Sequence, residues 1–288
     1  MKKTKIILLI LITFTIAFSF TPVATPQVGT YTFHGAAGNI KITKVRTANN
    51  SSLNDLFGAG YAPILEGFFG SGCLVVGAQK KSLVTAVNFS AKFDPLTYIF
   101  PVPGLAIMDI TEYNTSNWDW TTGSFSETPD SIGDIVQSFY DPANLTTFIN
   151  TLYATYPPNI PYNISTHTAG AFLAQLPTSV AQYLGALVWE PGWANLGNTI
   201  VHTALSGSYI FGTMIQYLED CTETWTYDST YGAWIGYKIQ DNETNTIYEY
   251  SIELATAAEI PGFEISLLLG ASMGMMVVLI FVMMKKRK

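Results

Sequence analysis

Two short segments of the sequence join tryptophan to carboxylate, a combination that binds sugars. The flat apolar face of tryptophan stacks on a sugar ring, and carboxylates accept hydrogen bonds from its hydroxyl groups. A glycan hydrolase would also need two carboxyl groups about 5–10 Å apart. The candidate ligand-binding residues are Trp118, Asp119, Trp120, Trp189, Glu190 and Trp193. Tryptophan is also a common core residue, so these segments predict either a binding cleft or anchors of the core.

The motifs of the common metal and nucleotide sites are missing from the sequence. It lacks the HExxH, Walker and CxxC patterns and has no DxDxDG-type calcium loop. His34, His167 and His202 are far apart and share no ligand spacing, so we expect structural or exposed histidines rather than zinc ligands. We therefore predict no catalytic residue, no metal and no cofactor, and we favour a non-enzymatic protein.

Cys73 and Cys221 are the two cysteines of the chain. In an oxidising compartment a disulfide between them would close a loop of about 148 residues. Such a bond contributes up to about 5 kcal/mol on the chain-entropy model. Two buried thiols are the alternative, and neither cysteine has a neighbouring histidine or basic residue that would make it a nucleophile.

The first third of the chain has the composition of strands. Residues 30–33, 40–45 and 83–93 are rich in β-branched and aromatic side chains, partly in alternation. Residues 57–77, between them, are apolar and Gly-rich. This piece fits either a tight hairpin or a loop over the core.

The middle of the chain has helical patterns. The pair Thr128-Pro129 is typical of an N-cap followed by proline at the first helical position. Ile132 and Ile135, followed by Val136 and Phe139, then recur at helical spacing, so we predict a helix over residues 128–139.

Two more helices are expected after it. An apolar stripe predicts a helix over residues 142–156, which ends at Pro157-Pro158. Another helix is expected to begin near Pro177. Its apolar stripe consists of Val180, Tyr183, Leu184, Leu187 and Val188.

The last third returns to strand patterns. Residues 223–227, 234–240 and 246–254 are separated by short turn-rich gaps, which predicts an antiparallel meander. In the last run Tyr248, Tyr250 and Ile252 share one face, which implies one buried and one wet side of the sheet. The fold class predicted is therefore α+β: a mostly antiparallel sheet of N- and C-terminal strands, with a central helical segment packed on one face.

The two ends of the sequence predict how the chain is oriented across a membrane. Residues 1–24 begin with lysines and continue in an apolar run, as in a secretory signal peptide. Residues 265–284 carry no charge and, as a helix, would span about 30 Å of hydrocarbon. The basic tail, residues 285–288, keeps this end in the cytoplasm. Residues 25–258 then form one exterior domain, joined to a transmembrane helix by the linker 259–264.

The tripeptide Pro261-Gly262-Phe263 stands directly before this apolar span and its basic tail. The arrangement resembles the C-terminal sorting signal of archaeal cell-surface proteins that are processed by archaeosortases. The resemblance covers residues 261–288 and implies a surface location and a sorting peptidase as a partner. In such proteins the helix is either kept or cut off and replaced by a lipid anchor.

The exterior domain is acidic. It contains seven of the 14 basic residues and 19 of the 21 acidic ones, a net charge of about −12. Nucleic-acid binding needs several cations that neutralise phosphates, so we exclude it. Seven Asn-x-Ser/Thr sequons are candidate glycosylation sites if the domain is exported. They are Asn49, Asn50, Asn88, Asn114, Asn144, Asn163 and Asn242.

These patterns leave three functions open for an exported, membrane-anchored surface protein. The first is a non-enzymatic ectodomain that binds a ligand or partner whose identity the sequence does not give. The second is an exported hydrolase that acts on glycans with carboxylates near the tryptophan pairs. The third is a carrier of lipid-like molecules, in which a wide sheet covered by helices encloses an apolar cavity. The partners predicted for the C-terminal segment are the lipid bilayer and, as the resemblance implies, a sorting peptidase.

Overall fold

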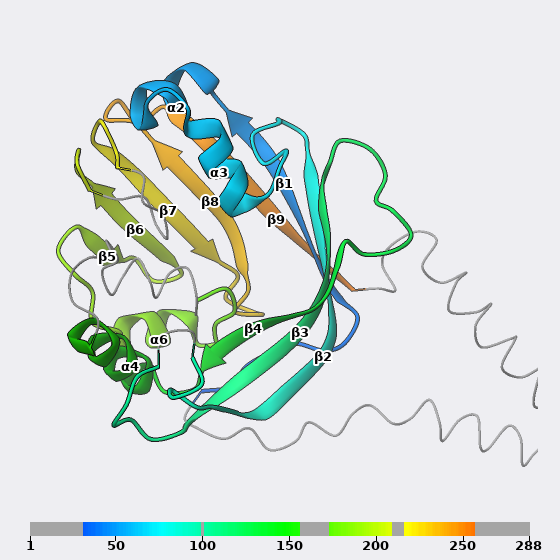
Figure 1. The fold of residues 1–288 in the computed structure, drawn as a ribbon, viewed down its shortest axis with the longest axis vertical. Helices are drawn as coiled ribbons and strands as arrows, with labels where there is room; N and C mark the ends of the chain where they lie inside the picture. The colour runs from blue at the N-terminus through cyan, green and yellow to red at the C-terminus, as the bar shows by residue number, and fades with distance from the viewer. Residues whose placement is uncertain (1–30, 99–100, 156–172, 209–215, 257–288) are drawn as a thin grey trace, which may run out of the picture.

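The computed structural model describes residues 31–98, 101–155, 173–208 and 216–256. Within these residues nine strands form a single antiparallel sheet, accompanied by a few short helices (Figure 1). The predicted sheet-rich α+β class is thus confirmed. In chain order the strands are β1 (Asn39–Ala48), β2 (Gln79–Phe93), β3 (Met108–Thr121), β4 (Ser131–Phe139), β5 (Trp193–Asn195), β6 (Thr199–Ala204), β7 (Cys221–Tyr227), β8 (Trp234–Gln240) and β9 (Thr246–Thr256).

Two meanders are joined at the centre of this sheet. The spatial order is β4-β3-β2-β1-β9-β8-β7-β6-β5, so the first meander runs from β1 to β4 and the second from β5 to β9. Strands β1 and β9 pair along most of their length, from Asn39 opposite Thr256 to Ala48 opposite Tyr248. The sheet is strongly curved, and β4 and β5 are its two free edges (Figure 1).

The sheet has a buried inner face and a wetter outer face, because side chains alternate along each strand. On the inner face of β9 lie Tyr248 and Tyr250, which are buried, and Ile252, which packs against the core. The outer face carries charge, for example the ion pair between Arg46 and Glu253 (2.9 Å). The expected division of this strand into one buried and one wet side is confirmed.

Two helices, α2 (Asn50–Phe57) and α3 (Tyr61–Phe69), follow β1 and lie over the inner face (Figure 1). Asn49 caps α2, since its side chain accepts a hydrogen bond from the Ser52 amide at 3.3 Å. Each helix ends at a glycine with positive φ, Gly58 and Gly70. Leu53, Leu56 and Leu65 of these helices are buried in the core.

The helices α4 (Pro142–Thr155) and α6 (Val180–Ala186) lie between the two edges of the curved sheet (Figure 1). Helix α4 contacts β4, α6 contacts β5, and the two helices contact each other. Tyr183 on α6 donates a hydrogen bond to the Phe139 carbonyl of β4 at 2.8 Å. The helices therefore bridge the edges and turn the open sheet into a trough with an enclosed interior. Both were expected from their apolar stripes, although Val188 of the second stripe is exposed.

The helix predicted over residues 128–139 is wrong, because this segment is mostly strand β4. Its apolar residues do not form a buried helical stripe, since Ile132 and Ile135 are exposed on the free edge of the sheet. Pairing with β3 from Ile110 to Asn117 supplies the backbone hydrogen bonds of the segment instead. The proposed hairpin or loop over residues 57–77 is also wrong in part, because it contains α3.

Several predicted features lie outside the described residues. These are the signal peptide, the tripeptide at residues 261–263, the apolar span 265–284 with its basic tail, His167, and the sequon at Asn163. Within the part of the chain that is described, no helix is long and apolar enough to cross a bilayer.

Candidate functional site

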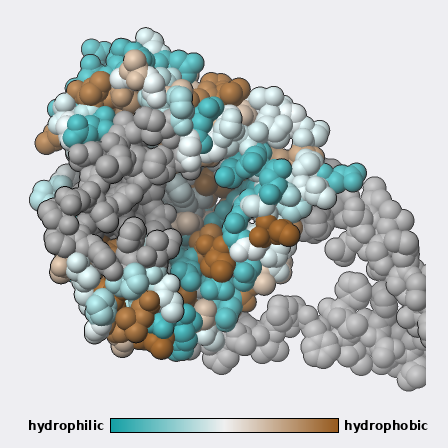
Figure 2. Space-filling model, in the orientation of Figure 1, coloured by the Kyte–Doolittle hydropathy of each residue, from teal (hydrophilic) through white to brown (hydrophobic). Residues whose placement is uncertain are grey.

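A cavity of about 460 Å³ opens on the inner face, where β1, β2, β3 and β9 meet. Figure 2 shows the molecule hollowed in the middle of this view. The apolar residues of the wall are Ile40, Phe69, Val84, Trp120, Val136, Ala174, Ala233, Trp234, Ile252, Leu254 and Ala255. None of the described residues that line the cavity is acidic. The site is therefore a mostly apolar pocket in which every formal charge is positive.

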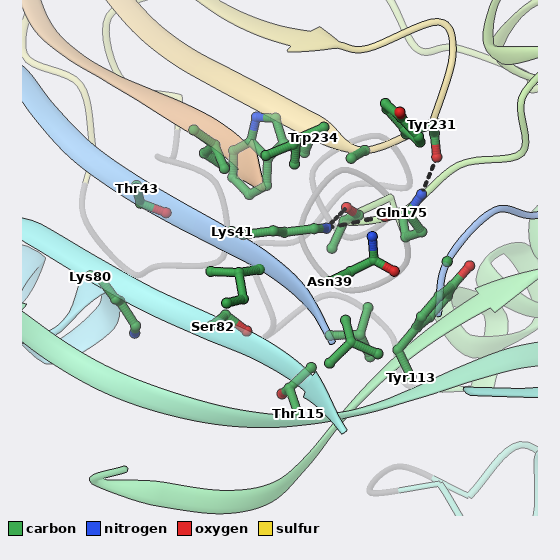
Figure 3. A pocket seen from close by; sticks show the side chains of 18 of the residues that line it. Asn39, Lys41, Thr43, Lys80, Ser82, Tyr113, Thr115, Gln175, Tyr231 and Trp234 are labelled. Atoms are coloured by element: carbon green, nitrogen blue, oxygen red, sulfur yellow. Dashed lines mark hydrogen bonds between the residues drawn. The ribbon is translucent and has the colours of Figure 1, made fainter. Parts of the chain in front are cut away.

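Lys41 is the cation at one end of this cavity (Figure 3). Its ammonium donates to Gln175 Oε1 at 3.1 Å and to the Ala174 carbonyl at 3.4 Å. Both acceptors are neutral, and no carboxylate lies within ion-pair distance among the described residues. Burial without a counter-charge lowers the pKa of Lys41 to about 8. Lys41 is thus a cavity cation for which the described residues supply no neutralising anion.

Gln175 is held in place by the turn between β7 and β8. Its Nε2 donates to the Tyr231 carbonyl at 2.5 Å, and its own carbonyl accepts from Ser138 Oγ at 2.6 Å. The backbone approach there depends on Gly232, because a Cβ at that position would lie 1.9 Å from the Leu176 carbonyl oxygen. The amide oxygen of Gln175 is consequently fixed toward Lys41.

Asn39 lies beside Lys41 and Gln175 at the same end (Figure 3). Its Oδ1 accepts a hydrogen bond from the Ala36 amide at 2.5 Å. Because that bond fixes the orientation of the amide, the Asn39 NH₂ group is turned toward Lys41 (Figure 3). We call Asn39, Lys41 and Gln175 the polar end of the cavity.

Lys80 is a second cation of the cavity, but it lies apart from the polar end. Figure 3 shows its side chain leaving β2 in a different direction from Lys41. Its charge acts on Asp134 of β4: hydrogen bonds from Ser131 and Asn117, and more weakly the Lys80 ammonium, lower the pKa of that carboxyl. The two cavity lysines therefore have different electrostatic surroundings.

The other end of the inner face, on β5–β8, is filled by an aromatic cluster of Trp189, Trp193, His202, Trp225 and Tyr237. Trp193 stacks on His202 with ring centroids 4.2 Å apart. A fully buried carboxylate, Glu223, lies among these rings. His202 Nδ1 is 2.7 Å from Glu223 Oε2, and Tyr237 donates its hydroxyl to Glu223 Oε1 at 2.5 Å. Both oxygens of this buried carboxyl group therefore have a hydrogen-bonding partner.

The two tryptophan–carboxylate segments are not joined in one site. Trp118 lies outside the cavity under the Lys81 ammonium, which is 3.5 Å from its ring centroid, and Asp119 is exposed. Trp120 lines the cavity, with its Nε1 donating to the Phe69 carbonyl at 2.6 Å. Trp189 and Trp193 belong to the aromatic cluster, and Glu190 lies in the turn before β5. Of the six candidates, only Trp120 lines this cavity.

The disulfide considered between Cys73 and Cys221 is not formed in this structure. Both residues are free, buried thiols. Cys73 follows α3, and its carbonyl accepts from Tyr248 on β9, whereas Cys221 begins β7, with β8 between the two strands. Burial raises the pKa of the Cys73 thiol to about 12 and raises that of Cys221 further. The alternative of two unreactive buried thiols describes this structure.

The described sequons lie at accessible positions. Asn49, Asn50, Asn88 and Asn242 are exposed, whereas Asn114 and Asn144 are half-buried. His34 lines the cavity and His202 belongs to the aromatic cluster.

The sequence patterns do not single out the residues of the polar end. A signal for them lies in the charge distribution, because six of the seven basic residues between positions 25 and 258 fall on β1 and β2. Arg46 and Lys92 pair with acidic residues, and Lys81 covers Trp118. Lys41 and Lys80 are turned to the inner face instead. Comparison of the chain with protein-family models, curated proteins and solved structures finds no match.

Proposed function

We propose that the exterior domain is a non-enzymatic binding protein that holds a lipid-like ligand in the inner-face cavity. The observation that carries this proposal is the cavity itself: about 460 Å³, with a mostly apolar wall in which Asn39, Lys41 and Gln175 lie close together (Figure 3). Pockets for small apolar ligands have this composition and a volume of about 300–1,000 Å³. A carrier is thus favoured over the two other functions that the sequence left open.

The cavity gives no support to a glycan hydrolase. Such an enzyme needs a pair of carboxyl groups in one cleft, and the described residues around the cavity include none. Asp119 and Glu190 lie elsewhere, and the aromatic cluster uses its own carboxylate, Glu223, in buried hydrogen bonds.

We further propose that the domain is exported and anchored at the cell surface by residues 265–284, with the bilayer as its partner. The charge pattern of the two ends and the resemblance of residues 261–288 to the archaeal sorting signal support this topology. Accessible sequons are consistent with it. Protease added to intact cells should digest the bulk of the chain, and a protected, cytosolic domain would contradict the proposal.

Binding in the cavity can be tested by fluorescence, because Trp120 and Trp234 line it. The probe is ω-bromoundecanol, an uncharged chain whose bromine quenches a nearby indole, titrated into the full chain in zwitterionic nanodiscs. Thr43→Phe places a ring in the cavity, whereas Ile42→Phe adds similar bulk to the neighbouring position on the outer face.

We expect saturable quenching in the wild type and in Ile42→Phe. Thr43→Phe should weaken it at least tenfold, because the ring occupies the space of the ligand. Equal quenching in both variants would mean that the chain binds outside the cavity and would overturn the proposal.

A further inference from the structure

We propose that the ligand is an acidic amphiphile whose anionic head group, a carboxylate or a phosphate, binds Lys41 and Asn39 at the polar end. This inference rests on the proposed function and adds the chemical class of the ligand. Its apolar chain would lie against the wall formed by Trp234, Ile252 and the neighbouring apolar side chains.

The first argument is the hydrogen-bonding capacity of Lys41. An ammonium carries three N–H donors, and the described residues accept two of them, through Gln175 and Ala174. Both bonds are at 3.1 Å or longer, so they are weaker than a charge-assisted bond to an anion, which is normally 2.7–2.9 Å. The third donor has no acceptor among the described residues and can serve a ligand in the cavity.

The second argument is that the neighbouring polar group is also a donor. The side-chain oxygen of Asn39 accepts a hydrogen bond from the Ala36 amide, and its NH₂ group is turned toward Lys41 (Figure 3). Two donors from the same face of β1, two residues apart in the chain, therefore lie close together, with no acidic side chain around them among the described lining residues. A carboxylate or phosphate oxygen is the acceptor that such a pair of donors fits.

The third argument is that packing does not explain a lysine at this position. A buried, unpaired charge destabilises a fold, and an apolar side chain of the same length would fill the space at lower cost. The exterior domain is strongly acidic as a whole, so its average field repels anions. An anion site inside it requires a local, enclosed cation, and Lys41 supplies one.

Lys80 does not meet these conditions equally well. It lies apart from Asn39 and Gln175 (Figure 3), and its charge already acts on the Asp134 carboxylate. The head group is therefore assigned to the Lys41 end, and Lys80 becomes the comparison that tests the assignment.

The experiment compares three probes that share one chain: ω-bromoundecanoate, ω-bromoundecyl phosphate and ω-bromoundecanol. Each is titrated by fluorescence quenching into the full chain in zwitterionic nanodiscs, with Thr43→Phe giving the background from the lipid. The variants are Lys41→Met, Lys80→Met and Lys44→Met. Lys44 is three residues from Lys41 on the same strand but lies on the outer face, so it is the matched control.

We expect at least one anionic probe to bind the wild type and Lys44→Met at least tenfold more tightly than the alcohol. In Lys41→Met this preference should fall below about twofold, while binding of the alcohol persists and reports an intact cavity. The preferred anion, carboxylate or phosphate, identifies the source of the head group.

Two results would overturn the inference. If all three probes bind the wild type equally, the cavity binds apolar ligands without preferring an anionic head group. The inference then fails, while the proposed function is unaffected. If the preference survives in Lys41→Met and is lost in Lys80→Met, the head group has been placed at the wrong lysine. Failure of every probe to quench would instead reject the proposed function itself.

Discussion

Two ionisable side chains on the inner face of the sheet, Glu223 and Lys41, have opposite surroundings. On β5–β8 the carboxylate of Glu223 is fully buried, accepts from Tyr237 and meets His202, and aromatic rings fill the surrounding space. On β1 and β2 the ammonium of Lys41 contacts only neutral acceptors and borders an open cavity. At the first end the carboxyl group is hydrogen-bonded within the packed core. At the other end the described residues offer the ammonium no anion, and a cavity stays open beside it.

This contrast distinguishes side chains that stabilise the core from side chains that are available to bind a ligand. A buried charge that is paired and enclosed by packed rings belongs to the core, and removing one partner leaves the others unsatisfied. A buried charge that is unpaired and faces empty volume weakens the fold, so its retention points to binding. Changes at the two ends should therefore have opposite effects on stability.

The largest effect is expected at the aromatic cluster. Glu223→Ala leaves His202 and Tyr237 without their shared acceptor and opens space among packed rings, so the free energy of unfolding should fall by about 3–5 kcal/mol. Urea unfolding followed by near-UV circular dichroism measures this loss. Glu249→Ala, on the outer face of β9, should change stability by less than about 0.5 kcal/mol. A loss below about 1 kcal/mol for Glu223→Ala would mean that the pair does not stabilise the core.

The second effect concerns the pH dependence of anion binding. Lys41 is charged below its pKa of about 8 and neutral above it, whereas the carboxylate probe is ionised throughout. Its affinity should therefore fall up to about 100-fold from pH 7 to pH 10, while that of the alcohol stays constant. The other titratable or charged groups that face the cavity are His34, Lys80, Tyr113, Tyr231 and Tyr250.

Two of those groups do not contribute to this transition. Burial raises the pKa values of Tyr113 and Tyr250 well above the ordinary value, so both hydroxyls stay protonated over this range. Lys41→Met should abolish the pH dependence. A fall in affinity of the same size in that variant would assign the titration to another group.

The third and smallest effect is a gain in stability at the polar end. Lys41→Met removes a partly buried charge that has no anionic partner among the described residues, so at pH 7 and without ligand the free energy of unfolding should rise by about 1–3 kcal/mol. Since the folded state holds Lys41 with a lowered pKa, the unfolded chain binds more protons between about pH 8 and 10. Wild-type stability should therefore rise through that window and approach the variant. Destabilisation by Lys41→Met would show that the lysine serves the fold.

Much of the sheet could be predicted because one buried face leaves alternation in the sequence. Tyr248, Tyr250 and Ile252 mark β9 in this way, and the stripe of residues 142–156 marks α4. The edge strand β4 could not be recognised by the same rule. Ile132 is 77% exposed and Ile135 is 54% exposed, so the apolar residues of β4 do not mark a buried face. Their spacing is instead the one expected of a helix.

The candidate site was harder to predict than the fold. Lys41 stands between two isoleucines, and alternation alone would place it on the wet side of the sheet. Its neighbour Gln175 is 134 residues away in the chain and reaches it only because the turn at Gly232 packs closely against Leu176. No local sequence pattern predicts this contact between Lys41 and Gln175. The excess of basic residues on β1 and β2 in an acidic domain was the one available hint.

The central claim, that the cavity holds an acidic amphiphile, is tested most directly by identifying what co-purifies with the full chain. Protein expressed in cells would be extracted with organic solvent, and the released molecules analysed by mass spectrometry alongside Thr43→Phe and Ile42→Phe. The wild type and Ile42→Phe should release a carboxylate- or phosphate-bearing amphiphile in near-stoichiometric amount, and Thr43→Phe should release little. The same lipid content in all three proteins, in proportions of the bulk membrane, would contradict the account.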